Sequence, residues 1–271
     1  MALKKILIIG IDSEIGHALK KLLLQNGFIV EGTSRKKNQL PNGVSFFDLK
    51  EPSFKFIDKH FDCVIICAAI TNISECEKQS FESEKVNVKN TIKLIVNATK
   101  NNSFVVFLSS NSVFDGTKPF YKHTDKTNPK NQYGKFKNSV EEFIKNNKDA
   151  CILRLTKVIS KKTPIIKNWE NQLAQGNSIV AYTNKFLSPV SIDNVVNSIQ
   201  ILINKKQNGI FQLGGSKEVS YFEFAQSYFK KSPNLLKLIK ADKDIMNDNR
   251  KKFNSLKTYL PIKDSASIIK N

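Results

Sequence analysis

The sequence contains no long apolar segment. None of the hydrophobic runs in its 271 residues approaches the roughly 18–20 residues of a membrane-spanning helix. The apolar run after Lys5 is roughly five residues long, shorter than the core of a secretory signal peptide, and no small-residue cleavage site follows it. We therefore expect no membrane insertion, a cytoplasmic location, and a first β-strand at this N-terminal run.

Cysteine and histidine are also scarce, at four and three residues. The cysteines show no Cys-x-x-Cys pair and no Cys/His cluster with the spacing of a zinc site. Free cysteine packs as a small hydrophobe, and buried packing is the simplest interpretation of all four. The sequence therefore predicts no metal centre and no disulfide framework.

Acidic residues are few beside basic ones, 24 against 43, so the formal net charge is +19. Such a balance raises the hypothesis of nucleic-acid binding. Only Arg35, Arg154 and Arg250 are arginines, however, and lysines spread along the whole chain supply the remaining positive charge. Base readout and bidentate phosphate binding favour arginine, so we expect no nucleic-acid partner and a general attraction for anionic small molecules.

Short apolar runs alternate with amphipathic helical stretches up to about residue 158. This alternation predicts an α/β fold in which helices cover both faces of a parallel sheet. The expected strands are 5–9, 28–33, 44–47, 63–68, 104–109 and 151–156, and the expected helices are 15–25, 82–100 and 132–146. Further on we expect helices near 165–175, 191–204 and 221–230, and strands at 178–182 and 209–213. The Lys/Asp/Asn-rich stretch 241–256 is interpreted as a mobile loop, with a solvated helix as the alternative.

A glycine-containing turn joins the first expected strand to the first expected helix. Gly10 and Gly16 suit a tight turn and close helix packing, in the place where helix N-terminal amides face a pyrophosphate. Ser13 replaces the central glycine of such a turn, and its hydroxyl is able to donate to a phosphate. A structural turn without a ligand is the alternative. The predicted cofactor contacts here are Gly10, Asp12, Ser13, Glu14, Ile15 and Gly16.

Arg35 ends the second expected strand about 20 residues beyond this turn. An acidic residue at this place receives a ribose 2′-hydroxyl, whereas an arginine accommodates a 2′-phosphate. Glu31 falls inside the strand, so Ser34 and Arg35 favour NADP(H), with NAD(H) as the alternative. The neighbouring Lys36 and Lys37 are interpreted as a solvated basic loop.

Tyr133 and Lys137 stand four residues apart at the start of an expected helix, so their side chains share one face. A nearby positive charge lowers the pKa of a phenol and makes it a usable proton donor and acceptor near neutral pH. Lysine is so abundant in this chain that the spacing alone also fits a solvated helix face.

Five motifs in order give this pair a context, and through them the chain resembles the extended short-chain dehydrogenase/reductases. The motifs are the turn 10–16, Phe47-Asp48-Leu49, Ala68-Ala69, Leu108-Ser-Ser-Asn-Ser-Val-Phe-Asp-Gly116 and Pro129-Lys-Asn-Gln-Tyr-Gly-Lys-Phe-Lys137. Within that superfamily the chain is similar to dTDP-4-dehydrorhamnose reductase-like proteins. The carriers are Ala-Ala-Ile-Thr71 with Glu75 and Glu77 after it, Val-Phe-Asp-Gly, Phe186-Leu-Ser-Pro-Val190, Gly209-Ile-Phe-Gln-Leu-Gly-Gly215 and Val219-Ser-Tyr-Phe-Glu-Phe-Ala225.

The resemblance implies a Rossmann-type doubly wound parallel sheet with a smaller C-terminal substrate-binding domain. We expect the Rossmann domain at residues 1–158 and the mainly substrate-binding part at 159–271, with about 187–204 returning to the first domain. The substrate implied is a nucleotide sugar, and the family suggests a homodimer.

The resemblance also assigns roles to single residues. Ser110 would hydrogen-bond the substrate, Tyr133 would transfer the proton, and Lys137 would hold the nicotinamide ribose. A strand-end turn residue is the alternative for Ser110. Asp48 and Leu49 would lie by the adenine and Ala68 and Ala69 beside the cofactor, while the expected substrate contacts are Thr71, Ser110, Asn111 and Tyr133.

Departures from related families narrow the expected reaction. Asn111 and Ser112 stand where sugar-nucleotide dehydratases carry an Asp-Glu pair, and no histidine lies in the C-terminal half for a multistep epimerisation. We therefore expect NADPH-dependent reduction of a nucleotide-linked 4-keto-6-deoxy sugar. The alternatives are an NAD-dependent 4-epimerase and a non-catalytic nucleotide-binding regulatory subunit.

Two further residues keep two interpretations each. Arg154 is expected either in a structural salt bridge or in contact with the substrate. Trp169 is expected to pack in the C-terminal part, with stacking on a base as the alternative.

Overall fold

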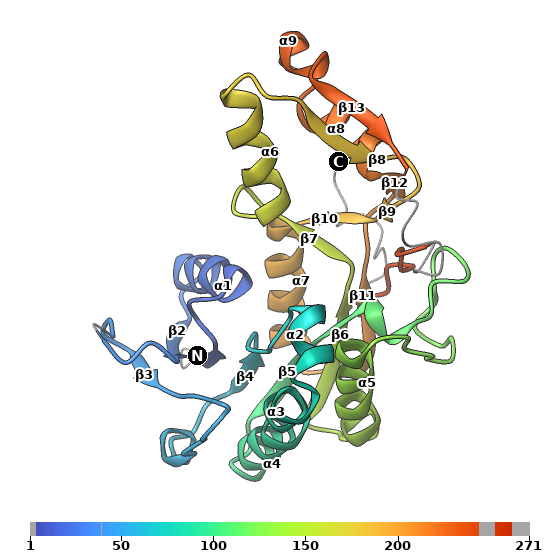
Figure 1. The fold of residues 1–271 in the computed structure, drawn as a ribbon. Helices are drawn as coiled ribbons and strands as arrows, with labels where there is room; N and C mark the ends of the chain where they lie inside the picture. Colours follow the sequence, from blue (N-terminus) through green and yellow to red (C-terminus); the bar gives the residue numbers. More distant parts are fainter. Residues whose placement is uncertain (1–3, 39, 244–252, 262–271) are drawn as a thin grey trace.

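A seven-stranded sheet organises the residues that the computed structural model describes, namely 4–38, 40–243 and 253–261 (Figure 1). Its strand order is β11-β6-β5-β4-β1-β2-β3, and every pairing between neighbours is parallel. This is the doubly wound order expected of a Rossmann-type sheet, so the predicted fold class is confirmed. The strands are β1 (Lys5–Ile9), β2 (Ile29–Ser34), β3 (Val44–Phe46), β4 (Cys63–Ile66), β5 (Phe104–Ser110), β6 (Ala150–Leu155) and β11 (Gly209–Leu213).

Helices cover both faces of this sheet. Because successive side chains of a strand point to opposite faces, Ile6 and Ile8 pack under one helical layer, while Leu7 and Ile9 pack under the other. The first layer contains α1 (Glu14–Gln25) and α7 (Ile192–Lys205), and the second contains α4 (Thr91–Lys100) and α5 (Gln132–Ile144). Among the described residues no helix is long and apolar enough to cross a membrane.

The long helix predicted at 82–100 is interrupted. The structure contains α2 (Ile73–Lys78) and α3 (Ser80–Glu84), then a π-helical turn, η2 (Lys85–Asn90), before α4 begins. The Thr91 hydroxyl donates to the carbonyl oxygen of Val86 at 2.9 Å, five residues back. A π-turn admits one extra residue per turn and is often found near functional sites, so its surroundings are described with the cleft below.

A C-terminal lobe, here residues 164–187 and 216–242, stands above the carboxyl ends of the central strands (Figure 1). Its core holds Trp169, Leu173 and Phe229, and Trp169 is 4% exposed, as the packing interpretation expects. The lobe contains α6 (Pro164–Ala174), β8 (Ile179–Tyr182), α8 (Tyr221–Tyr228), α9 (Pro233–Leu236) and β13 (Ile239–Asp242). The division into two domains at residue 158 stays a prediction.

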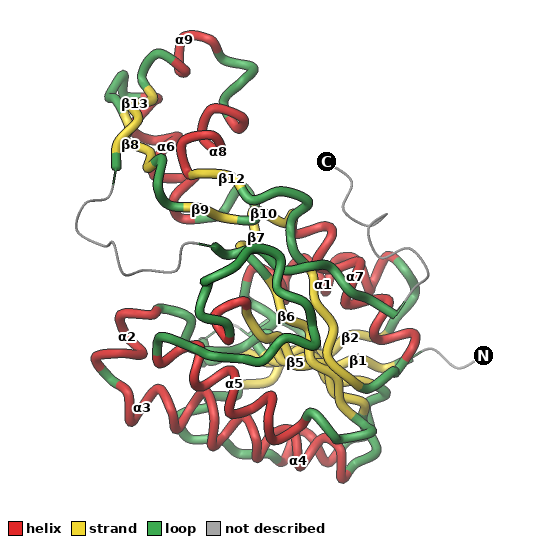
Figure 2. The backbone as a smooth tube through the Cα atoms, turned by 90° about the vertical axis from the view of Figure 1, so that its right-hand side faces the viewer, coloured by secondary structure: helices red, strands yellow, loops and turns green. Residues whose placement is uncertain are grey.

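Two short strand pairs that the sequence did not predict lie where the lobe meets the sheet (Figure 2). The parallel pair is β7 (Lys157–Ile159) with β10 (Pro189–Ser191), and the antiparallel pair is β9 (Phe186–Leu187) with β12 (Val219–Ser220). Two short 3-10 turns complete the elements, η1 (Lys55–Asp58) and η3 (Asn111–Val113).

The C-terminal segment 253–261 returns from the lobe to the sheet. Leu256 forms a β-bridge with Tyr121, and Tyr259 forms one with Gln212 of β11. Of the stretch 241–256 that was predicted as a loop or solvated helix, residues 244–252 lie outside the described residues. Residues 241 and 242 belong to β13, so the prediction is wrong there, whereas residues 253–256 have no regular structure, as a loop does. Ser255 and Leu256 are buried, so this segment, here called the strap together with Lys257, is packed against the loop that follows η3.

Candidate active site

A cleft of about 250 Å³ opens at the carboxyl ends of β1, β2 and β4. The strand order reverses between β1 and β4, which is where doubly wound sheets bind their ligands. Three of the predicted cofactor residues, Glu14, Ile15 and Gly16, belong to the first turn of α1 and do not line the cleft. The predicted residues that do line it are Gly10, Asp12, Ser13, Ser34, Arg35, Asp48, Leu49, Ala68 and Ala69.

The glycine turn at the floor of the cleft has no room for side chains. Gly10 has φ +80°, and a Cβ there would lie 3.1 Å from that of Ala68. A Cβ on Gly16 would lie 2.4 Å from the carbonyl oxygen of Gly10, so α1 is able to start this close to β1 only with glycine. This backbone cradle at a helix N-terminus fits the diphosphate of a dinucleotide.

Ser13 lies between Gly10 and Gly16 in the same turn. Its hydroxyl oxygen accepts a hydrogen bond from the backbone N–H of Gly16 at 3.0 Å, and Ser13 is therefore the N-cap of α1. An accepting hydroxyl still has its own hydrogen to donate. Ser13 thus serves the helix and leaves the predicted phosphate contact open.

The far end of the cleft carries opposite charges. The Ser34 hydroxyl donates to Asp12 Oδ2 at 3.2 Å, and the ammonium nitrogen of Lys36 lies 3.9 Å from the same oxygen. Arg35 lines the cleft, is exposed, and forms no hydrogen bond or ion pair with any residue that the structure describes. Its guanidinium is therefore available to an anionic group at the rim.

The π-turn η2 holds the two loops that form the sides of the cleft. The buried Asn87 side chain accepts from the backbone N–H of Ile70 and donates to its carbonyl oxygen, both at 2.9 Å. Asn90 Nδ2 donates to the carbonyl oxygen of Leu49 at 2.7 Å. The sequence did not predict that these two asparagines hold the loops of the cleft. The one sign of this role was the presence of amide side chains within a helix that is otherwise amphipathic.

Ser110 and Tyr133 come together at the end of β5 because α5 starts unusually close to η3. Asn131 caps α5 by accepting from the backbone N–H of Gly134 at 2.7 Å. A Cβ on Gly134 would lie 2.1 Å from the carbonyl oxygen of Ser112. The glycine between Tyr133 and Lys135 is therefore what lets this helix approach η3.

Burial sets the protonation of the two predicted proton-handling residues. It raises the pKa of Tyr133 to about 12, and a hydrogen bond with the Ser110 side chain acts in the opposite direction. It lowers the pKa of Lys137 to about 8, partly offset by the carboxylate of Glu141. The expected lysine-lowered phenol is therefore wrong in this structure, because desolvation of the phenolate dominates.

The Lys137 ammonium contacts β5 and lies near the Tyr133 ring. Its ammonium donates to the carbonyl oxygen of Leu108 at 2.8 Å and lies 5.8 Å from the centre of the Tyr133 ring. Its charge also acts on the thiol of Cys67, which lines the cleft. The group Ser110, Tyr133 and Lys137 thus borders the cleft without lining it.

Arg154 is held in a buried salt bridge, which decides between its two interpretations. Its Nη2 lies 2.6 Å from Glu141 Oε2, and both side chains are nearly inaccessible, at 3% and 2% exposed. Its Nη1 donates to the carbonyl oxygen of His123 and to Gln212 Oε1, both at 3.3 Å. Arg154 therefore ties α5 to the loop 114–128 and to β11.

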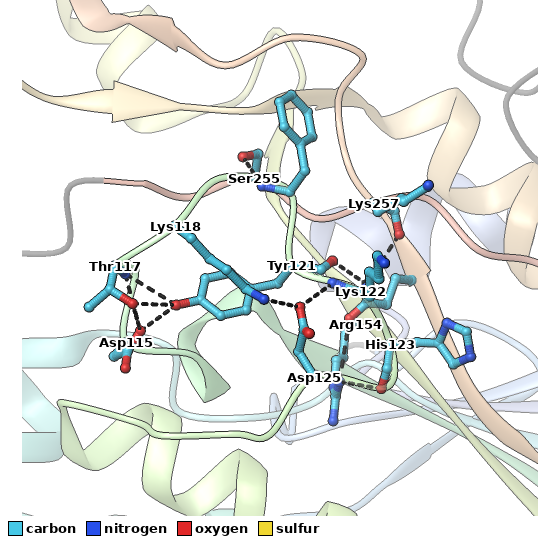
Figure 3. A network of polar contacts seen from close by, with 12 residues as sticks. Asp115, Thr117, Lys118, Tyr121, Lys122, His123, Asp125, Arg154, Ser255 and Lys257 are labelled. Atoms are coloured by element: carbon cyan, nitrogen blue, oxygen red, sulfur yellow. Dashed lines mark hydrogen bonds and ion pairs between the residues drawn. The ribbon is translucent and has the colours of Figure 1, made fainter.

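Asp115 of the Val-Phe-Asp-Gly motif organises the loop 114–128 (Figure 3). Its carboxylate accepts from the hydroxyls of Tyr121 and Thr117 and from Asn128 Nδ2. The hydrogen bond from Tyr121 is the main reason why the pKa of Asp115 lies well below its usual range. The motif residue thus shapes the loop beside the site.

The remaining predicted substrate residues are Thr71 and Asn111. Thr71 is exposed directly after Ile70, which lines the cleft. Asn111 is half-buried beside Ser110 and accepts from the Ser110 hydroxyl at 3.2 Å. Their contact with a substrate stays a prediction.

Comparison with known proteins gives a family match and several similarities that cover most of the chain. The family model described as RmlD substrate binding domain matches residues 4–258. The dTDP-4-dehydrorhamnose reductase of Aggregatibacter actinomycetemcomitans is 27% identical over 237 residues, which cover 83% of this chain and 78% of that protein. The methionine adenosyltransferase 2 subunit beta of Bos taurus is 24% identical, over 82% of this chain and 70% of that protein.

Among solved structures, a dTDP-4-dehydrorhamnose reductase from Bacillus anthracis str. Ames in complex with NADP superposes with a TM-score of 0.82. It is 18% identical and covers 95% of this chain and 92% of its own. At this identity the likeness concerns the fold.

Proposed function

Because the chain belongs to the RmlD substrate binding domain family, we propose that it is an NADPH-dependent reductase of a nucleotide-linked 4-keto-6-deoxy sugar. The observation that carries the proposal is the convergence of Ser110, Tyr133 and buried Lys137 beside a cleft that contains the glycine turn and Arg35. The relatives named as sugar-nucleotide reductases supply the substrate class.

The protonation states suit a reduction. With its pKa raised to about 12, Tyr133 carries its proton at neutral pH and is able to donate it to the oxygen of a reduced carbonyl. Lys137, with a pKa of about 8, is mostly charged at pH 7 and stabilises the phenolate that this donation leaves. A bound nicotinamide cofactor supplies the hydride.

The cleft residues have matching tasks in binding. The cradle at Gly10 and Gly16 receives a diphosphate, and Arg35 receives a 2′-phosphate, which favours NADP(H) over NAD(H). Ser110 Oγ, whose hydrogen is donated to Asn111, accepts from a hydroxyl of the sugar beside Tyr133. Asp48 and Leu49 are proposed to contact the adenine, and Ala68 and Ala69 to lie beside the cofactor.

The direct test incubates the protein with NADPH and dTDP- or UDP-4-keto-6-deoxyglucose and follows the nicotinamide absorbance. We expect turnover with one of these nucleotides and an about 10²–10⁴-fold loss of kcat in Tyr133→Phe, the usual worth of a positioned proton donor. Tyr228→Phe is the matched control, since among the described residues that hydroxyl bonds only to Glu170, at 2.9 Å on the C-terminal lobe. Firm cofactor binding without turnover of any 4-keto sugar nucleotide would contradict the proposal.

The relatives named methionine adenosyltransferase 2 subunit beta support a second candidate, a non-catalytic regulatory subunit. Tyr133→Phe separates the two functions: it abolishes turnover by a reductase and leaves the partner binding of a regulatory subunit unchanged. An NAD-dependent 4-epimerase would retain its cofactor through purification, which a reductase that exchanges NADPH does not.

A further inference from the structure

A residue from the far end of the chain reaches the side chain next to Ser110. Asn111 Nδ2 donates to the backbone carbonyl oxygen of Asn254 at 2.8 Å and to its side-chain Oδ1 at 3.3 Å. Asn111 Oδ1 accepts the hydroxyl hydrogen of Ser110 at 3.2 Å. Two hydrogen bonds therefore connect the Ser110 hydroxyl to Asn254, which is 143 residues from Asn111 along the chain.

Asn254 is held in turn by the C-terminal lobe. Its Nδ2 donates to the carbonyl oxygen of Phe186 in β9 at 2.9 Å, and its backbone N–H donates to Glu218 Oε1. The second carboxylate oxygen of Glu218 accepts from the Ser255 hydroxyl at 3.2 Å. Glu218 thus fixes two successive residues of the strap.

The strap is also fastened to the loop on the other side of the site. Ser255 Oγ accepts from the backbone N–H of Phe120 at 2.8 Å, and the backbone N–H of Lys257 donates to the carbonyl oxygen of Tyr121 at 2.8 Å. Figure 3 shows Ser255 and Lys257 above the loop that carries Tyr121. Residues 254–257 therefore lie between the lobe and the loop 114–128 and bond to both.

This arrangement fixes the direction of each hydrogen bond. A backbone carbonyl oxygen only accepts, so Asn111 has to present Nδ2 to Asn254 and Oδ1 to Ser110. Turning the Asn111 amide over would place an oxygen against an oxygen. The backbone N–H of Ser112 donates to Ser110 Oγ at 3.1 Å and is a further contact of this hydroxyl, beside the hydrogen bond with Tyr133.

We propose that Glu218 and Asn254 are positioning residues that hold Asn111, and through it the Ser110 hydroxyl, at the place where the sugar carbonyl is reduced. The role rests on the proposed reductase function. If so, the correct position of Ser110 depends on the contacts between the C-terminal lobe and the strap. Loss of these contacts should lower the rate without abolishing binding, because misplacement of a catalytic group affects mainly the rate.

The kinetic test is a double-mutant cycle with Glu218→Gln and Asn111→Ala. Glu218 does not contact Asn111, so additive losses are expected unless the strap connects them. We expect Glu218→Gln to lower kcat about tenfold, to leave KM for NADPH unchanged, and to cause no further loss in the Asn111→Ala background. Equal fold-losses in both backgrounds would overturn the proposal.

Glu223→Gln is the matched control. Glu223 accepts from the backbone N–H and the hydroxyl of Ser220 at 2.7 and 2.9 Å, the same kinds of donor that Glu218 holds, but at the N-terminus of α8. We expect it to leave kcat unchanged. A loss equal to that of Glu218→Gln would show a general effect on the lobe and overturn the proposal.

A second measurement needs no turnover. We expect the amide of Ser112 to exchange its hydrogen faster in Glu218→Gln than in wild type and Glu223→Gln, because loosening Asn111 releases Ser110 Oγ. If the wild type reduces no 4-keto sugar nucleotide, the proposed function fails while this exchange still tests the positioning. Unchanged exchange at Ser112 would overturn the proposal.

Discussion

The cleft and the surroundings of Ser110, the proposed cofactor and substrate sides of the site, are assembled in different ways. The cleft is lined by residues between Ile9 and Val86, most of them at or just after the carboxyl ends of β1 to β4, with Val86 in η2. The substrate side joins Asn111 to Phe186, Glu218 and Asn254, which are brought together only by the C-terminal lobe and the strap. The first region is built within one N-terminal stretch, where η2 holds the loops of the cleft, whereas the second depends on contacts between segments that are much further apart along the chain.

The largest expected effect of breaking contacts between distant segments is a loss of stability at the buried Arg154–Glu141 ion pair, which connects α5 to the loop 114–128 and to β11. We expect Glu141→Ala to lower the free energy of unfolding by about 3–5 kcal/mol, because it leaves the Arg154 charge buried and unpaired. Urea denaturation measures the change. The adjacent Glu142→Ala is the control: it removes an exposed contact with Lys145, with an expected cost of about 0.5 kcal/mol or less. Equal costs at the two positions would show that the pair does not carry this connection.

The second-largest expected effect concerns the close approach of α5 to η3. We expect Gly134→Ala to lower kcat about a hundredfold, since its Cβ would lie 2.1 Å from the carbonyl oxygen of Ser112 and push Tyr133 away. Ser139→Ala, on the exposed side of the same helix, should leave kcat unchanged. Cofactor affinity, followed by fluorescence titration, should change little in either variant. An unchanged kcat in Gly134→Ala would show that the close approach is not required.

A change confined to the cofactor region should affect binding and spare the chemistry. We expect Arg35→Ala to weaken NADPH binding about tenfold or more while NADH binding is unchanged, because only NADPH offers a phosphate to the guanidinium. Isothermal titration with both cofactors measures this. Lys37→Ala, in the same loop but with its ammonium over the Phe46 ring, is the control. Equal loss for NADPH and NADH would show that Arg35 does not read the 2′ position.

The smallest expected effect is a pH dependence of kcat/KM that is set by Lys137. Burial lowers the pKa of Lys137 to about 8, so kcat/KM for reduction should fall as the pH rises through about 8 and the ammonium loses its proton. As the pH rises above about 8, the free energy of unfolding should increase. The reason is that the pKa of Lys137 is 10.5 in the unfolded chain, so the unfolded chain binds more protons than the folded one in this range. A parallel urea series distinguishes loss of charge from unfolding. Lys137→Met should lack this limb of the profile.

What the sequence predicted follows the same division. The strands and the turn at Gly10 were predicted, because alternation of apolar residues and glycine spacing are local signals. Asn87, Gly134, Glu218 and Asn254 were not, since each acts on a segment that is distant along the chain or is defined only by packing.

Two errors have the same physical cause. The expected fall in the pKa of Tyr133 was wrong because burial, which no spacing of residues reports, outweighs the neighbouring lysine. The helix expected at 82–100 was wrong in its middle, where the π-turn brings Asn87 and Asn90 onto the loops of the cleft. In both cases the environment of the folded chain decided the outcome.

The strap has a consequence for the order in which the protein is made. A ribosome releases Ser110, Tyr133 and Lys137 long before Asn254, which is 143 residues beyond Asn111. N-terminal units fold first during synthesis, so the nascent chain is able to form the cleft and bind its cofactor while Asn111 still lacks its partner. Under the proposed function, the ability to bind the cofactor would therefore precede the ability to react, and a chain that stalls before residue 254 would lack the contact that orients Ser110 through Asn111.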